Sequence, residues 1–135
     1  MTMSDLNSLL GDADLEAEAK QYMQDVVDDF TVGDYRFIHQ DAIDEILADE
    51  LSGDEYVLGC FNASFIAAVT DWPLALIEAA QKGQQYKAIG EAIIKGKFIR
   101  ELAERYARAD GYGHHFAHYD GHEHEIGAYY AFKVE

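Results

Sequence analysis

Five of the six histidines in this 135-residue sequence lie between His114 and His124, and their spacing suits metal chemistry. Neutral imidazole nitrogens are good zinc ligands, and three of them leave one coordination position open. The dipeptide Asp120-Gly121 is typical of a two-residue hairpin turn, so the sequence predicts two strands joined through it, one over residues 114–119 and one over residues 126–134. In that register one face of the hairpin carries three candidate zinc ligands, which are His115, His122 and His124, and the second face offers His118 and Glu123 instead.

Two other interpretations of this histidine cluster stay open. Its spacing matches no closed zinc signature, and histidines on an exposed hairpin also serve structural or surface roles. Imidazoles beside Asp120, Glu123 and Glu125 would also gain positive charge on mild acidification, which is the basis of a pH response. We therefore expect no cofactor, with zinc as the alternative.

The acidic residues form a second group of interest, because they are concentrated in one part of the chain. The sequence has 26 acidic and 10 basic residues, a formal net charge of -16. Residues 1–55 hold 16 of the acids and only two bases, Lys20 and Arg36. Such an asymmetry indicates an electrostatic partner, and its sign disfavours nucleic acid and anionic membranes as direct ligands. The expected partner is a basic protein.

Nine acidic side chains on the outer faces of two predicted helices are the candidate partner-binding residues. They are Glu16, Glu18, Asp25, Asp28, Asp29, Asp44, Glu45, Asp49 and Glu50. Carboxylates three and four residues apart on a helix lie about 5 to 6 Å from one another, so two such helices could imitate part of a DNA phosphate lattice. Asp28 and Asp29 are expected to close the first helix, and Asp49 and Glu50 the second, where acids are unfavourable to the helix dipole; this repeated departure favours a functional demand. The alternative is a solvated face, or one that pairs internally with basic helices over residues 87–108.

No motif of nucleophilic catalysis or nucleotide binding is present in the sequence. It lacks G-x-S-x-G and H-E-x-x-H, and Gly111-Tyr112-Gly113 follows a predicted helix rather than a strand. Cys60 lies in the most apolar segment, where a thiol is typically a small core residue. We therefore expect a non-enzymatic protein, although the many carboxylates leave room for a catalytic pair.

Helical periodicity predicts the elements that position the acidic residues. Apolar residues at helical spacing predict an amphipathic helix over residues 14–29, and Asp41 is a candidate N-cap for a second helix that stops near Gly53. A third helix from Glu55 to Val69 is apolar on nearly every side, so we expect it to be the buried central element.

Glycine and proline mark the remaining helices. Pro73 and Gly83 are expected to bound a fourth helix, and one or two more follow with a break at Gly96. Together with the C-terminal strands, residues 35–38 complete a small sheet. The predicted fold is α+β, with four to six helices packed on one face of a small three-stranded antiparallel sheet.

The last strand predicts a further contact. If Tyr130 and Phe132 pack against the helices, Tyr129 points outward beside Lys133 and is available to a partner or to a homodimer.

Length and composition set the domain organisation. A chain of 135 residues with 49% hydrophobic residues is expected to form one domain over residues 14–135, preceded by a flexible tail over residues 1–13. The single cysteine allows no internal disulfide, and no signal-like or membrane-spanning segment is evident. We expect a cytoplasmic protein.

Two stretches resemble segments of small acidic proteins of unassigned function from tailed bacteriophages. They are Gly59-Cys60-Phe61-Asn62-Ala63-Ser64-Phe65 and Asp110-Gly111-Tyr112-Gly113-His114-His115-Phe116-Ala117-His118-Tyr119-Asp120-Gly121. The order of elements over residues 30–132 is also similar. The resemblance implies a phage product acting in a bacterial cytoplasm, and it assigns no residue a role. The partner expected in that setting is a host nucleic-acid enzyme or a defence factor.

Overall fold

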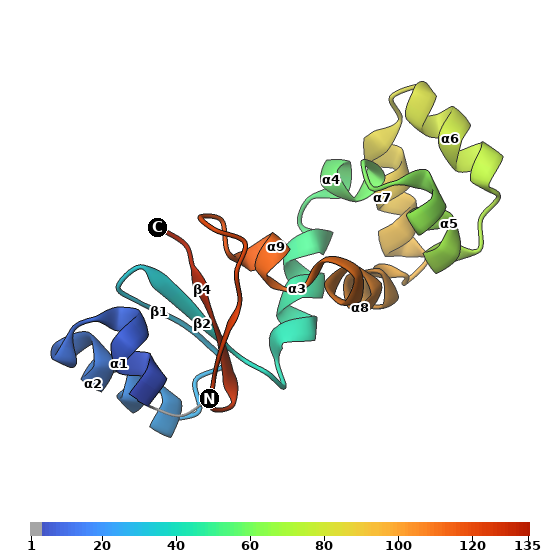
Figure 1. Cartoon of the computed structure of the whole chain (residues 1–135). Helices are drawn as coiled ribbons and strands as arrows, with labels where there is room; N and C mark the ends of the chain where they lie inside the picture. The colour runs from blue at the N-terminus through green and yellow to red at the C-terminus, as the bar shows by residue number, and fades with distance from the viewer. Residues whose placement is uncertain (1–3) are drawn as a thin grey trace. The chain divides into compact units, whose positions relative to one another are not determined.

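A computed structural model describes residues 4–135, and their side chains from Leu6 onward (Figure 1). The chain divides into two compact units, one made of the residues up to Ile43 together with Asp110–Glu135, and one made of Asp44–Ala109. The first unit contains α1 (Ser4–Leu10), α2 (Ala13–Gln24), β1 (Asp29–Val32), β2 (Tyr35–His39), α9 (Gly113–Phe116), β3 (His124–Ile126) and β4 (Tyr129–Lys133). The second contains α3 (Ile43–Ser52, apart from its first residue), α4 (Glu55–Gly59), α5 (Ala63–Thr70), α6 (Leu74–Lys82), α7 (Tyr86–Lys95) and α8 (Ile99–Asp110, apart from its last residue).

The first unit is built on an antiparallel sheet of four strands in the order β1-β2-β4-β3. The predicted α+β class with an antiparallel sheet is therefore confirmed, but both predicted numbers are wrong: the described residues form four strands instead of three, and nine helices instead of four to six. Residues 29–39 form a hairpin, because Gly33 takes a positive φ of 60° and Val32 pairs with Tyr35 across a two-residue turn. A second hairpin turns at Gly127, whose φ is 59°, and pairs Ile126 with Tyr129.

Helices α1 and α2 cover one face of this sheet (Figure 1). Leu6 and Ala19 are fully buried there against Phe30 and Phe37, whose rings stack at 5.0 Å. Residues 1–13 were expected to form a flexible tail, and the structure places Ser4–Leu10 of that segment in a helix. Residues 1–3 lie outside the described part of the chain.

The opposite face of the sheet is covered by α9, so the expectation of helices on one face only is wrong. Phe116 of α9 lies 5.2 Å from the ring of Phe132, and the guanidinium of Arg36 stacks on Phe116 at 5.1 Å. Residues 114–119 do not form the predicted strand, and Asp120-Gly121 is not a hairpin turn. Instead, the carboxylate of Asp120 accepts a hydrogen bond of 2.9 Å from the backbone N–H of His122, which forms a local turn.

Tyr129 points inward, which corrects the predicted orientation of the last strand. It is 4% exposed, packs edge-on against Phe30, and donates a hydrogen bond of 2.8 Å from its hydroxyl to the carbonyl oxygen of Val27. Phe132 is also buried, on the other face. Because helices cover both faces of the sheet, alternation along β4 does not separate an inner from an outer side.

The second unit, Asp44–Ala109, is called the helical unit below. In it the predicted helix from Glu55 to Val69 is broken into α4 and α5. The side chain of Asn62 accepts a hydrogen bond of 2.9 Å from the backbone N–H of Ser64 and so caps α5. The exposed positions of α4, Tyr56 at 57% and Val57 at 44%, show that this segment is not buried on all sides. The boundaries predicted at Pro73, Gly83 and Gly96 agree with the structure.

Two glycines let α4 and α7 cross with their backbones in contact. A Cβ atom on Gly59 would overlap the carbonyl group of Tyr86, and one on Gly90 would overlap the carbonyl group of Glu55. Both helices therefore need glycine at the crossing point. Within residues 4–135, no helix combines the length and the apolar composition needed to cross a membrane.

Candidate functional site

The outer face of α2 carries a stripe of exposed acidic side chains. The helix begins at Asp12, whose carboxylate accepts hydrogen bonds from the backbone N–H groups of Asp14 at 2.8 Å and Leu15 at 3.2 Å. Its inner face buries Ala19 against the sheet. The spacing of Asp14, Glu18 and Asp25 places all three on the opposite side, where each is exposed.

Two of the predicted partner-binding residues in the first unit are held by basic groups of the same unit. Glu16 accepts a hydrogen bond of 2.7 Å from the side chain of Asn7 and forms an ion pair of 3.0 Å with Lys20. The hydrogen bond from Asn7, followed by the one from Lys20, lowers the pKa of Glu16. Asp29 accepts two hydrogen bonds from Arg36, 2.9 Å from Nε and 2.6 Å from Nη2.

Helix α2 is shorter than predicted, which changes the argument from the helix dipole. It ends at Gln24, with Asp25 as its C-cap, because Val26 has a left-handed φ of 52°. Asp28 and Asp29 therefore do not close the helix, and Asp29 belongs to β1. The acid at the negative end of the helix dipole is Asp25, so the dipole argument made for Asp28 and Asp29 does not hold.

The remaining four predicted residues lie on α3, which has the amphipathic pattern expected of it. Leu47, Ala48 and Leu51 are buried, and the exposed acids Glu45 and Asp49 are four residues apart on the other side. Asp44 and Glu50 lie on the same helix, and each takes part in an interaction with another residue. Because α3 belongs to the helical unit, the nine predicted residues form two acidic groups, one in each unit.

The three candidate zinc ligands lie on three different segments. His115 is on α9, with its ring 4.8 Å from that of Phe116; His122 is exposed in a loop; and His124 is on β3, where its ring lies 6.1 Å from that of Tyr35. The hairpin register that would place them on one face is absent. In the part of the chain that the structure describes, no three His, Cys, Asp or Glu side chains are grouped closely enough to hold a metal ion.

Glu123 lies in the loop between α9 and β3, and its surroundings change its pKa. Partial burial, and then the neighbouring charge of Glu125, raise its pKa, while a hydrogen bond with the backbone of Tyr112 opposes the change. Its Oε1 atom also lies beside Gly111. The carboxylate therefore links the loop to the start of α9.

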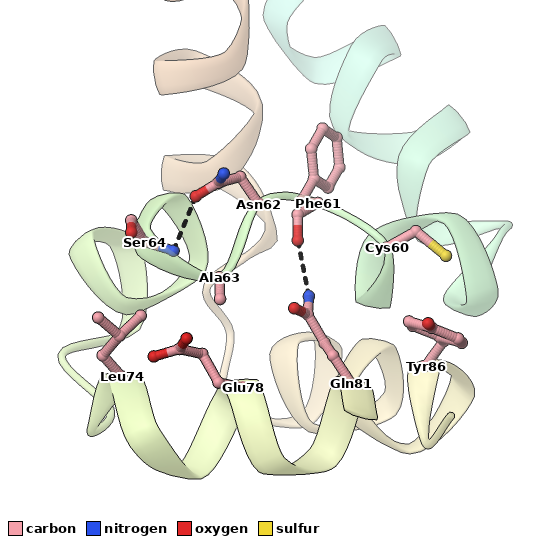
Figure 2. A pocket seen from close by; sticks show the side chains of 9 residues that line it. All are labelled: Cys60, Phe61, Asn62, Ala63, Ser64, Leu74, Glu78, Gln81 and Tyr86. Atoms are coloured by element: carbon pink, nitrogen blue, oxygen red, sulfur yellow. Dashed lines mark hydrogen bonds between the residues drawn. The ribbon is translucent and has the colours of Figure 1, made fainter. Parts of the chain in front are cut away.

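Sequence reasoning missed a polar cavity of about 450 Å³ in the helical unit (Figure 2). It lies between α6 and the segment that joins α4 to α5. Its lining residues are Cys60, Phe61, Asn62, Ala63, Ser64, Leu74, Glu78, Gln81 and Tyr86. The nitrogen of the Gln81 side chain donates hydrogen bonds to the carbonyl oxygens of Gly59 at 3.0 Å and Phe61 at 2.7 Å, which holds the connection in place.

Cys60 lies at this cavity and is exposed, so the expectation that it is a core residue is wrong. Interaction with Cys60, more than burial, raises the pKa of the neighbouring Tyr56 hydroxyl. The ring of Tyr56 in turn packs edge-on against Tyr86 at 5.3 Å. The break between α4 and α5 explains the exposure, because it places Cys60 at the end of a short helix.

The cavity and the two acidic groups are candidate functional features of the described residues. In comparisons with known proteins, no family model, no curated protein and no solved structure matches this chain.

Proposed function

We propose that the protein is a non-enzymatic interaction protein that binds a basic protein through its acidic side chains. The observation that carries this proposal is the charge balance of the first unit, which has 15 acidic and three basic residues and a net charge of -12. All three bases are already engaged. Lys20 pairs with Glu16, Arg36 pairs with Asp29, and Lys133 lies 4.2 Å from the ring of Tyr119.

The exposed stripe of α2 is the part of this unit that we assign to the partner. Glu18 and Asp25 are exposed on it, and Asp28 is exposed just beyond its end. On this face Asp14 and Glu18 are four residues apart, which places their Cβ atoms about 5 to 6 Å from one another, a spacing that a groove lined with Lys and Arg can engage. The acids of α3 supply a second group for the same kind of partner.

This charge pattern supports DNA mimicry as the mode of binding. Proteins that hold DNA present basic grooves, which gain affinity by releasing counterions from the acidic ligand. The partner would then be a host nucleic-acid enzyme or a defence factor. With the resemblance to phage proteins, we propose that the protein is phage-encoded and acts in the bacterial cytoplasm.

A zinc-binding function on the histidines remains the alternative proposal, but no observation favours it. His115, His122 and His124 are not on one hairpin face. The homodimer contact expected at Tyr129 likewise lacks its basis, because that side chain is buried.

Affinity capture from bacterial lysate tests the proposal with two charge-matched triple variants. The first neutralises two acids of the α2 stripe and the exposed acid just beyond it, with Glu18→Gln, Asp25→Asn and Asp28→Asn, and is called the stripe variant. The second is a control that neutralises three exposed or half-buried acids of the helical unit. Its substitutions are Asp71→Asn, Glu91→Gln and Glu104→Gln.

The proposal predicts that wild type and the control capture the same DNA-binding proteins at about 50 mM salt and lose them at about 500 mM. The stripe variant should capture less of each protein than wild type at about 50 mM salt, and none at about 500 mM. Equal capture by the stripe variant and wild type would refute the proposal. Equal loss by both triple variants would show that binding follows net charge and not the α2 stripe.

A further inference from the structure

The cavity beside α6 presents hydrogen-bond acceptors to a ligand. Glu78 and Gln81 are one turn apart, and Figure 2 shows both side chains rising from α6 toward the segment of residues 61–64. Both hydrogen bonds from the Gln81 nitrogen go to backbone carbonyl groups, so its remaining polar atom, Oε1, is an acceptor. The Glu78 carboxylate is also an acceptor.

The residues that line the cavity include a single charged side chain, which is negative. Glu78 is the only Asp or Glu among the lining residues, and no Lys, Arg or His lines the cavity. Lys82 follows Glu78 by one helical turn, but the two do not form an ion pair. A carboxylate in an otherwise uncharged cavity favours a cationic ligand.

The aromatic side of the cavity favours a planar cation. Figure 2 places Tyr86 on the far side of Gln81 from Glu78, and its ring packs edge-on against that of Tyr56. Leu74, which is 42% exposed, adds apolar surface at the opposite end. A guanidinium can stack on an aromatic ring while its N–H groups donate to a carboxylate, whereas an ammonium lacks this planar geometry.

We propose that this cavity binds an arginine side chain of the basic partner. The guanidinium donates to Glu78 and to Oε1 of Gln81, and its plane lies against Tyr86. The volume of about 450 Å³ is in the range of small-ligand sites. This inference rests on the proposed function, because it names the chemistry by which the helical unit recognises the same basic partner.

An NMR titration of the ¹⁵N-labelled full-length chain tests the inference without any partner protein. The probe is N-acetyl-arginine methylamide. The same titration uses N-acetyl-citrulline methylamide, which keeps the shape but has no charge, and N-acetyl-lysine methylamide. Amide shifts should move at Ala63, Ser64 and Gln81 with the arginine probe, and the citrulline probe should bind about tenfold more weakly.

Glu78→Gln should weaken binding of the arginine probe by about tenfold, because it removes the charge that the guanidinium faces. Glu104→Gln is the matched control, an exposed glutamate on α8 of the same unit, and should leave the affinity unchanged. Equal binding of the arginine and citrulline probes, or unchanged binding to Glu78→Gln, would overturn the inference. A lysine probe that binds as tightly as the arginine probe would overturn the choice of arginine.

The titration and the capture experiment fail independently. If the arginine probe does not bind in the titration but capture still depends on the α2 stripe, the arginine site is refuted and the proposed function stands. If capture fails but the arginine probe still binds in a way that depends on Glu78, the proposed function is refuted and the cavity remains a binding site for a cation.

Discussion

Alanine in place of Gly90 should destabilise the helical unit, because α4 and α7 touch through their backbones at that residue. A Cβ atom built on Gly90 would overlap the Glu55 carbonyl group and lie 2.8 Å from the Glu55 Cα atom. All three nearest atoms are backbone, so no side chain can rotate away. The two helices would have to separate, which would loosen the packing around the buried Leu58 and Ile93.

The size of the effect follows from two opposing terms. Overpacking in a dense core costs about 1 to 3 kcal/mol, and a clash against rigid backbone belongs at the upper end. Alanine recovers about 1 kcal/mol because it is a better helix former than glycine. The free energy of unfolding should therefore fall by about 2 kcal/mol, which lowers Tm by about 8 °C in a domain of this size.

Urea denaturation followed by tryptophan fluorescence measures this change within the helical unit. The only tryptophan, Trp72, is half-buried there with its ring edge-on to Phe98 at 5.5 Å. Gly83→Ala is the matched control, because its Cβ would lie no closer than 3.5 Å to any atom and should change stability by less than about 0.5 kcal/mol. A Gly90→Ala variant as stable as Gly83→Ala would refute the close crossing.

Three further predictions concern the first unit. Leu6→Ala should cost about 3 kcal/mol in thermal unfolding followed by circular dichroism, because Leu6 is fully buried; an unchanged Tm would show that α1 does not pack on the sheet. Tyr129→Phe should cost about 1 kcal/mol in urea, since it removes the hydrogen bond to Val27, and no loss would argue against that bond. Burial and then Glu125 raise the pKa of Glu123, so the stability it contributes in its protonated form is lost as pH rises through that pKa. Glu123→Gln should therefore raise Tm at pH 7 and leave it unchanged at pH 3; a rise at both would contradict this origin.

Local signals predicted much of the helical unit. Pro73, Gly83 and Gly96 act on the backbone of their own segment, so their positions mark helix boundaries without knowledge of the tertiary structure. Residues 114–119 were misassigned because so short a run fits one helical turn as well as a strand. The contact of Phe116 with Phe132 decides between the two, and it depends on the tertiary fold.

For the candidate sites, residue types can be predicted from the sequence, but the contacts between residues distant in the sequence cannot. Acidic side chains on the outer faces of α2 and α3 follow from periodicity, but the pairing of Asp29 with Arg36 depends on the register of a hairpin. The cavity had no local signal at all. It depends on Gln81 reaching the carbonyl group of Phe61, which is 20 residues earlier in the sequence.

The salt dependence of affinity for a captured, purified partner tests the central claim most directly. The dissociation constant of wild type and of the Glu18→Gln, Asp25→Asn, Asp28→Asn variant would be measured from about 50 to about 500 mM salt. The account predicts that wild-type affinity falls steeply with salt, and that the variant binds more weakly with a shallower dependence. Affinity that does not change with salt, or equal slopes for the two proteins, would contradict it.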